Sequence, residues 1–367
     1  MLSTSNDKSI IGLDVEAGSL AASQLAGNGS RSVSQVAITP LEGGLIKEGE
    51  VIDPEGLSAA LRTMFAEHKL SKTVRVGIAN QRVAVRTFRL PLIEDPKELD
   101  TAIRFQAQEH LPMPLDQAVL DHQVVGRSDD GEGNRSMEVV AVAARRDMLQ
   151  SLLAALSGAG LRPAGIDLSA FALIRALSGA TDGPTADPTD STPESEPGAE
   201  DAHAPASLYC NLGDVTNLAV ARGSNCLFTR VSPFGVEVIA QRLAERRTLA
   251  MDHARQWLTH VGFERPLGEI EGDPEIIAAT REVLEEGASK LADELRLSLE
   301  FYAAQEGVPP VERIVIAGAG SAIPGLIGRL QTGLGQDLAT VRPGALAQLG
   351  DEAAARLTVS YGLALED

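Results

Sequence analysis

Two stretches about 200 residues apart repeat one pattern of apolar and polar positions. Residues 208–220, LYCNLGDVTNLAV, contain an apolar run, a tight turn at Gly213 and Asp214, and a second apolar run. Residues 10–20, IIGLDVEAGSL, show the same design near the N-terminus. Apolar runs joined by so short a turn are typical of β-hairpins. We therefore predict two related half-domains, each beginning with a hairpin, that face one cleft.

Helical and strand-like periods alternate through the rest of both halves, which predicts an α/β protein. Acidic residues and proline mark three helix starts, at residues 53–55, 94–96 and 273–275. We expect helices over residues 53–69, 97–110, 147–160, 169–177, 235–244, 251–261, 273–301 and 323–334, and one that contains residues 361–365. Beyond the two hairpins, we expect strands over residues 33–40, 74–79, 83–90, 119–125, 137–144, 162–167, 225–231 and 313–317.

Residues 181–207 interrupt this alternation with proline, serine, threonine and acidic residues and no lysine or arginine. Such a composition cannot bury a core and predicts a self-repelling, flexible linker. It divides the chain into a first lobe, residues 1–180, and a second lobe, residues 208–367. We further expect a small inserted α+β subdomain at about 97–160 and a helical subdomain at about 235–290.

The chain of 367 residues has a formal net charge of −19 and a sequence pI near 4.8. Nucleic acid is therefore excluded as a partner, because neutralising phosphates requires a basic face. An anionic membrane surface is disfavoured for the same reason, so membrane contact is expected only through a partner. The start of the sequence lacks the pattern of a signal peptide and no run of about 18 apolar residues exists, which indicates a cytoplasmic location.

The residue pattern offers little support for metal or hydrolytic chemistry. The two cysteines, Cys210 and Cys226, are expected to be free thiols on adjacent strands. Cysteine and histidine residues with metal-ligand spacing are not found, and no Ser/His/Asp constellation or nucleophile elbow is visible. We therefore predict no metal site made by side chains alone and assign no catalytic residue.

Three loops share a pattern suited to binding an oxyanion. In each, a strand ends and glycine or a small residue follows, so that backbone N–H groups can approach a phosphate. The candidate binding residues are Asp14, Gly18 and Ser19 in the first loop, Asn211, Gly213, Asp214 and Thr216 in the second, and Gly318, Gly320 and Ser321 in the third. Their order and separation resemble the two phosphate loops and the adenosine loop of the actin-like, or ribonuclease H-like, two-lobed fold.

The first half carries a more specific resemblance. It contains VRTFRLP, then a helix that ends at LPMPL, then VAARRDML and GLRPAGIDLSAFALIRAL. This block of about 90 residues is similar to the type IV pilus assembly protein PilM family, and weaker similarity continues through FTRVSPFGVEVIAQRL and IVIAGAGSAIPGL. The resemblance implies a cytoplasmic scaffold of the pilus assembly platform, with ATP and Mg²⁺ as the cofactors of the actin-like fold.

Several residues depart from the family pattern at the nucleotide loops. Glu16 stands in place of glycine, Ala21 in place of lysine, Asn211 in place of aspartate and Ala319 in place of glycine. Glu16 would repel phosphate, and Ala21 removes a cation. Three interpretations stay open: a scaffold with a weak or degenerate nucleotide site, the same scaffold still binding ATP–Mg²⁺, and another actin-like member such as an FtsA-like filament protein or a relative of sugar kinases.

The resemblance also implies a partner. PilM proteins capture the short cytoplasmic N-terminus of the membrane protein PilN in a groove beside the inserted subdomain, and so lie at the inner face of the cytoplasmic membrane. Other platform proteins and further copies of the chain are additional expected partners. The residues expected to line the groove are Arg86, Phe88, Leu111, Met113 and Leu115.

Overall fold

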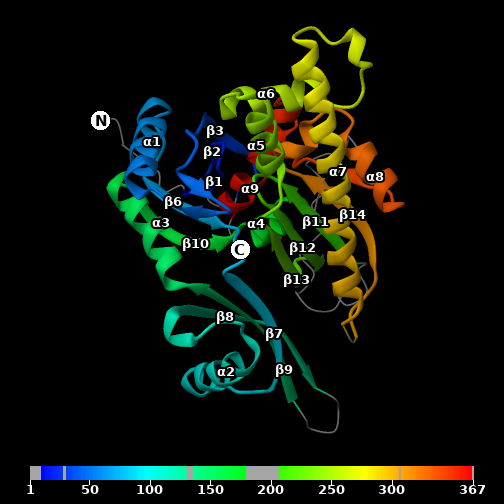
Figure 1. The fold of residues 1–367 in the computed structure, drawn as a ribbon. Helices are drawn as coiled ribbons and strands as arrows, with labels where there is room; N and C mark the ends of the chain where they lie inside the picture. The colour runs from blue at the N-terminus through cyan, green and yellow to red at the C-terminus, as the bar shows by residue number, and fades with distance from the viewer. Residues whose placement is uncertain (1–9, 28–29, 130–134, 179–205, 306, 366–367) are drawn as a thin grey trace.

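The computed structural model describes residues 10–27, 30–129, 135–178, 206–305 and 307–365. Within these ranges the chain forms two lobes, and a small subdomain extends below the first lobe in the view of Figure 1. The predicted linker, residues 181–207, lies almost wholly outside the described residues.

A five-stranded sheet in the order β10-β6-β1-β2-β3 forms the centre of the first lobe. Strand β2 is antiparallel to both β1 and β3, whereas β6 is parallel to both β1 and β10. The strands are β1 (Ile11–Val15), β2 (Ser19–Leu25), β3 (Val33–Pro40), β6 (Thr73–Ile78) and β10 (Arg162–Leu168). Helices α1 (Pro54–Glu67) and α3 (Arg146–Gly158) pack against each other on the side away from the second lobe (Figure 1). A short pair, β4 (Ile46–Lys47) and β5 (Glu50–Val51), precedes α1.

The second lobe repeats this plan with the sheet β13-β12-β11-β14-β15. The prediction of two hairpin-led half-domains is confirmed, because β11–β12 is antiparallel as β1–β2 is, and β14 is parallel to β11 as β6 is to β1. The strands are β11 (Ala206–Leu212), β12 (Thr216–Arg222), β13 (Asn225–Ser232), β14 (Val311–Ala317) and β15 (Ala339–Thr340). The helices are α5 (Val236–Arg247), α6 (Met251–Val261), α7 (Pro274–Ala303) and α8 (Leu326–Leu334), with short turns η2 (Leu267–Glu269), η3 (Ala319–Ala322) and η4 (Gly344–Leu346).

Helices α4 (Ser169–Leu177) and α9 (Asp351–Ala364) lie between the two sheets (Figure 1). Helix α9 packs on β1 and β2 of the first sheet, and α4 packs on β11 and β12 of the second. One apolar core therefore runs from the first lobe through both helices to Tyr209 and Ala219. The sequence placed α9 with the second lobe, but in space it completes the first, which is a long-range relationship that no local pattern encodes.

Glycines permit this close packing. A Cβ atom on Gly12 would lie 1.9 Å from the carbonyl oxygen of Ser360, and one on Gly362 would lie 1.9 Å from that of Ala172. Any larger residue at either position would force the backbones apart. The α9 helix can therefore contact both β1 and α4 because these two positions have no side chain.

The small subdomain is a three-stranded sheet in the order β7-β9-β8, with one helix packed on it. Its elements are β7 (Val83–Pro91), α2 (Pro96–His110), η1 (Leu115–Gln117), β8 (Ala118–Asp129) and β9 (Arg135–Arg145). It therefore begins at residue 83 and ends at residue 145, not at 97 and 160 as expected. The difference arises because β7 pairs along its whole length with β9, whereas α3 packs on α1 in the first lobe.

Candidate functional site

The tips of the two hairpins meet at the cleft between the lobes. The backbone N–H of Ala17, in the β1–β2 turn, donates to Asp214 Oδ2 at 2.9 Å across the lobes. Asp214 lies in the β11–β12 turn, where its Oδ1 also accepts from Val215 N at 2.7 Å. This pair of turns brings the first two predicted phosphate loops together, as the hairpin repeat predicted.

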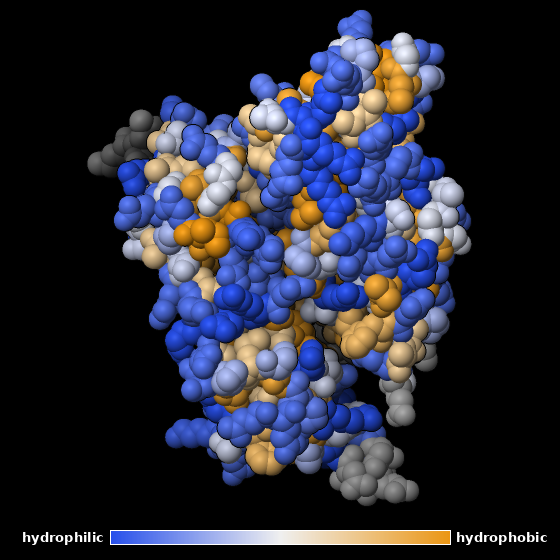
Figure 2. All heavy atoms as spheres, viewed as in Figure 1, coloured by the Kyte–Doolittle hydropathy of each residue, from blue (hydrophilic) through white to orange (hydrophobic). Residues whose placement is uncertain are grey.

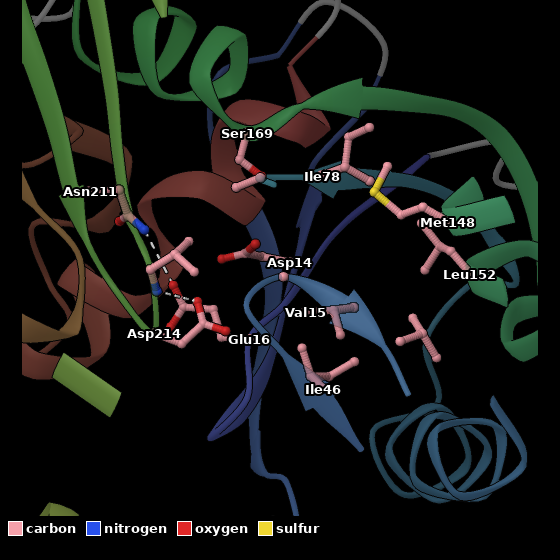
Figure 3. A pocket seen from close by; sticks show the side chains of 15 residues that line it. Asp14, Val15, Glu16, Ile46, Ile78, Met148, Leu152, Ser169, Asn211 and Asp214 are labelled. Atoms are coloured by element: carbon pink, nitrogen blue, oxygen red, sulfur yellow. Dashed lines mark hydrogen bonds between the residues drawn. The ribbon is translucent and has the colours of Figure 1, made fainter. Parts of the chain in front are cut away.

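The cleft is lined by residues from both lobes. Asp14, Glu16, Asn211 and Asp214 contribute polar groups on one side, and an apolar wall completes it (Figure 3). The lining residues are Asp14, Val15, Glu16, Ile46, Gly49, Val51, Gly77, Ile78, Ala79, Met148, Leu152, Ser169, Asn211, Asp214 and Val215. The apolar wall includes Met148 and Leu152 of α3, a helix that the sequence predicted without placing it beside the cleft.

Three carboxyl groups share this small space. Burial, and then the charge of Asp214, raises the pKa of Asp14 to about 7. Burial raises the pKa of Asp214 to about 6, although N–H groups of Ala17 and Val215 oppose the shift. Burial and the charges of Asp214 and Asp14 hold the pKa of Glu16 well above its ordinary value. Like charges this close in a poorly hydrated site disfavour one another, so the cleft resists further negative charge.

Glu16 occupies the space in front of the second hairpin. Its Oε1 accepts from Asn211 Nδ2 at 3.2 Å, and a Cβ atom on Gly213 would lie only 2.0 Å from that same oxygen (Figure 3). The glycine expected to let a phosphate approach is thus already covered by a carboxylate.

An arginine beside the first hairpin is paired with acids. Arg255 of α6 donates from Nε and Nη2 to Glu237 at 2.8 and 2.6 Å, and from Nη1 to Asp252 at 2.5 Å. Its guanidinium lies over the first hairpin, since a Cβ atom on Gly18 would be 2.9 Å from Arg255 Nε. The pairing of Arg255 with Glu237 was not predicted from the sequence, because the two residues lie on different helices.

A second arginine reaches the first loop from the C-terminal helix. Arg356 of α9 donates from Nη2 to Glu352 at 3.2 Å and from Nη1 to the buried Ser19 Oγ at 3.4 Å. Its charge lowers the pKa of Glu16 only in part, because burial and the neighbouring acids outweigh it.

Two other predicted residues do not face the cleft as expected. Thr216 is fully buried, and its hydroxyl donates to the carbonyl oxygen of Phe234 at 2.7 Å. It lies on the same face of β12 as Leu218, away from the cleft, because side chains alternate along a strand. Ser321 donates to the carbonyl oxygen of Gly318 at 2.7 Å and so closes its own loop.

The third loop packs against the end of β11. Gly318 has φ = 86°, and a Cβ atom there would lie 2.5 Å from Asn211 Oδ1. Gly320 is buried against Leu212 and Val236. The structure thus brings the third loop to Asn211, next to the cleft, but none of its predicted residues lines the cleft itself.

The side chains that line the cleft carry acidic groups but no basic ones. Of the residues that line it, three are acids and none is lysine or arginine.

Within the described ranges, no group of three or more histidine, cysteine, aspartate or glutamate residues is arranged to hold a metal ion. Both cysteines are free thiols, as expected. The helices in those ranges include none that is both long and apolar enough to cross a membrane.

A second hollow, which we call the interlobe groove, lies where the small subdomain meets both lobes. It is lined by Ile78, Ala79, Asn80, Gln81, Val83, Ala84, Val85, Arg86, Pro112, Leu168, Ala170, Asn217, Thr229, Arg230 and Val231. In the space-filling view the surface is hollowed between the small subdomain and the second lobe, with hydrophobic residues at its edge (Figure 2). Gln81 Nε2 spans the two sides by donating to the carbonyl oxygen of Val231 at 3.4 Å.

Two edge strands border the interlobe groove. β7 is at one edge of the small sheet and β13 at one edge of the second-lobe sheet, and residues of both strands line the groove. An edge strand carries main-chain N–H and C=O groups that can pair with an added strand. The groove therefore offers two strand edges together with an apolar floor from Ile78, Leu168 and Ala170.

The expected groove residues divide into two groups. Arg86 is exposed and lines the groove, next to Pro112. Phe88 is instead buried in the subdomain core with Leu99 and Ile103, which rules it out as a groove residue here.

The remaining three belong to a second core of the same subdomain. Leu111 is buried there with Ala107 and Ala143, and Met113 and Leu115 pack against it. The family resemblance led us to expect these three in the groove, but after the helix break at Pro112 and Pro114 the chain packs them into the subdomain.

Comparison with known proteins agrees with this architecture. The model of the family described as type IV pilus assembly protein PilM matches residues 12–366. The solved PilM-PilN type IV pilus biogenesis complex contains a chain that is 26% identical, with 98% of each chain covered and a TM-score of 0.76.

More distant structures share the fold alone. They include the ethanolamine utilization protein EutJ from Carboxydothermus hydrogenoformans, with 13% identity, a TM-score of 0.52 and 97% and 89% of the two chains covered. MreB5 of Spiroplasma citri bound to ADP has 12% identity and a TM-score of 0.50, with 96% and 94% covered. The predicted actin-like two-lobed fold is confirmed. Because the family model extends over nearly the whole chain, this protein belongs to the type IV pilus assembly protein PilM family.

Proposed function

We propose that this protein is a scaffold of the type IV pilus assembly platform and holds the N-terminal cytoplasmic peptide of a PilN-like membrane protein in the interlobe groove. The observation that carries the proposal is a groove bordered by two edge strands. It occurs in a chain that matches, over 98% of its length, a chain from a PilM-PilN complex. Through such a partner the protein would lie at the inner face of the cytoplasmic membrane, and other platform proteins or further copies of the chain could join the assembly.

The groove suits an extended peptide better than a helix. A peptide strand added to β7 or β13 would satisfy main-chain groups that the edge leaves unpaired, while alternate side chains enter the apolar floor. Main-chain pairing supplies affinity with little dependence on sequence, and the side-chain pockets supply selectivity. Arg86 and Arg230, which line the groove, would favour a peptide without a strong positive charge.

The proposal is tested by titrating the full chain into a fluorescently labelled synthetic peptide of the cytoplasmic N-terminus of its own PilN-like protein. Saturable binding that an unlabelled peptide competes away is expected, and a scrambled peptide of the same composition should bind at least tenfold more weakly. No saturable binding, or equal binding of the scrambled peptide, would overturn the peptide-binding role.

We further propose that the cleft takes no part in ATP turnover and binds nucleotide weakly or not at all. Three carboxyl groups face the space where phosphates would lie, and Glu16 covers the second hairpin. The nearby Arg255 is already paired with Glu237 and Asp252. A phosphate entering the cleft would have to displace Glu16 and lie beside two further carboxyl groups, Asp14 and Asp214.

A fluorescent ATP analogue with Mg²⁺ tests this second proposal. Dissociation constants above about 1 mM are expected, equivalent to a binding free energy weaker than about −4 kcal/mol. Micromolar affinity would instead support the alternative of a nucleotide-loaded PilM scaffold, and it would leave the peptide-binding proposal intact.

A further inference from the structure

Asn217 of β12 is a buried polar side chain without a partner. It is 1% exposed, and neither its Nδ2 nor its Oδ1 forms a hydrogen bond within the described part of the chain. Folded proteins rarely leave both ends of a buried amide unpaired, and each case calls for an explanation. An aliphatic residue of similar size would fill the same space without that cost.

The position of this side chain points to a ligand. Asn217 lines the interlobe groove from β12, which packs against α4, and Leu168 and Ala170 at the start of α4 line the same groove. Its strand neighbour Val231 is at the β13 edge, one strand closer to the opening. The unpaired amide is thus a buried polar group among the residues that line the groove where we place the peptide.

An asparagine amide has the same donor and acceptor groups as a peptide bond. Its oxygen accepts, and its nitrogen donates two hydrogen bonds. It can therefore pair with one main-chain N–H and one C=O of an extended chain, whatever the side chains of that chain are.

We propose that Asn217 is the polar anchor of the groove and forms hydrogen bonds with the main chain of the bound peptide. This inference rests on the proposed peptide-binding function and adds the second lobe to the binding surface. Because both amide atoms are shielded, the peptide reaches them only when α4 and β12 separate locally. The bound peptide then contacts both lobes, and it contacts the second lobe at Asn217, next to the β11–β12 turn.

The test compares Asn217→Leu and Asn217→Ala with the wild type, using the labelled PilN-like N-terminal peptide and the full chain. Loss of one or two hydrogen bonds should weaken binding about tenfold or more. The melting temperature of Asn217→Leu should stay equal or rise, because the variant removes an unpaired buried amide. Thr280→Val is the control: it removes a buried hydroxyl that donates to Ile276 O at 2.7 Å, far from the groove, and should leave peptide affinity unchanged.

The outcomes separate the two proposals. If the wild type binds the peptide and both Asn217 variants bind equally well, the anchor is overturned and the peptide function stands. If the variants lose affinity and stability together, Asn217 supports the fold and the anchor is again overturned. If the wild type does not bind the peptide, both proposals fail.

Discussion

Asn211 and Asn217 lie directly opposite each other on β11 and β12, and each lines a different hollow. Asn211 donates to Glu16 in the cleft, whereas Asn217 has no partner of its own in the described chain and lines the interlobe groove. Ile78 and Ala79 form part of the wall of both hollows. The cleft and the groove are therefore neighbours that share one strand pair and part of one wall.

Replacing Glu16 and Ala21 should restore nucleotide binding. Ala21 is the cross-strand neighbour of Asp14, so a lysine there would place its ammonium group beside that carboxyl group. The double variant Glu16→Gly, Ala21→Lys removes the carboxyl group that covers the second hairpin and adds one positive charge. We expect at least tenfold tighter binding of a fluorescent ATP analogue with Mg²⁺ than for the wild type. Glu42→Gln, which neutralises an exposed acid outside the cleft, is the control, and equal affinity of all three proteins would show that charge does not block the site.

Stability should fall as the pH rises from about 4 to about 7. The pKa of Asp14 is raised from 3.8 to about 7 and that of Asp214 from 3.8 to about 6. In this window the unfolded chain loses protons that the folded chain keeps, so ionisation favours unfolding. The hydrogen bond from Arg145 lowers the pKa of Asp147 to about 2, so protonation of this carboxylate reduces stability only below this pH range.

The variant Asp14→Asn isolates this effect. At pH 8 it should raise the free energy of unfolding by about 1 to 3 kcal/mol, because it removes a poorly solvated charge, and at pH 4 the gain should vanish. Urea unfolding at several pH values measures it. Asp100→Asn, at an exposed ion pair with Arg104, should show no such trend. A pH-independent difference for Asp14→Asn would contradict the raised pKa.

Arg86→Glu should abolish peptide binding without unfolding the protein. Arg86 is exposed on β7 and lines the groove. A glutamate there would face the carbonyl oxygens of an added strand and would lose the apolar stem of arginine. At least a tenfold loss is expected in calorimetry with the PilN-like peptide. Arg89→Glu, an exposed position of the same strand that does not line the groove, is the matched control, and equal losses for both would indicate a general charge effect.

Gly362→Ala should destabilise the protein by about 1 to 3 kcal/mol or more, because the new methyl group would overlap the Ala172 carbonyl oxygen. Gly328→Ala is the opposite case. Its Cβ would meet open space within α8, so it should stabilise the protein by about 0.5 to 1 kcal/mol. Thermal unfolding of both variants checks the pair. Equal stability of Gly362→Ala and the wild type would show that α9 can shift away from α4.

Local elements were predictable from sequence where a local interaction determines them. The helices Ser169–Leu177 and Met251–Val261 have the predicted bounds. Asp53 and Asp273 cap the helices that follow them by accepting from backbone N–H groups, as the Asp-Pro-Glu pattern indicated. The hairpin repeat predicted two related lobes because its period is visible within a dozen residues.

Relationships between distant segments were not predictable in this way. The contact of Glu16 with Gly213 and Asn211 joins residues about 195 positions apart. Sequence reasoning expected conflict between Glu16 and phosphate, but not that the carboxylate would fill the space above the second hairpin. Thr216 and Phe88 were misassigned because a one-residue change of strand face, or the direction of a chain after a helix break, depends on packing across the whole lobe.

The position of α9 has a consequence for how the protein is made. During synthesis on the ribosome, β1 emerges more than 300 residues before the helix that covers it. The apolar face around Gly12 must remain open, or be held by a chaperone, until α9 has been released. The first lobe of this protein therefore cannot complete its fold before α9 is made. A chain that stops before α9 would expose the apolar face of β1 and β2.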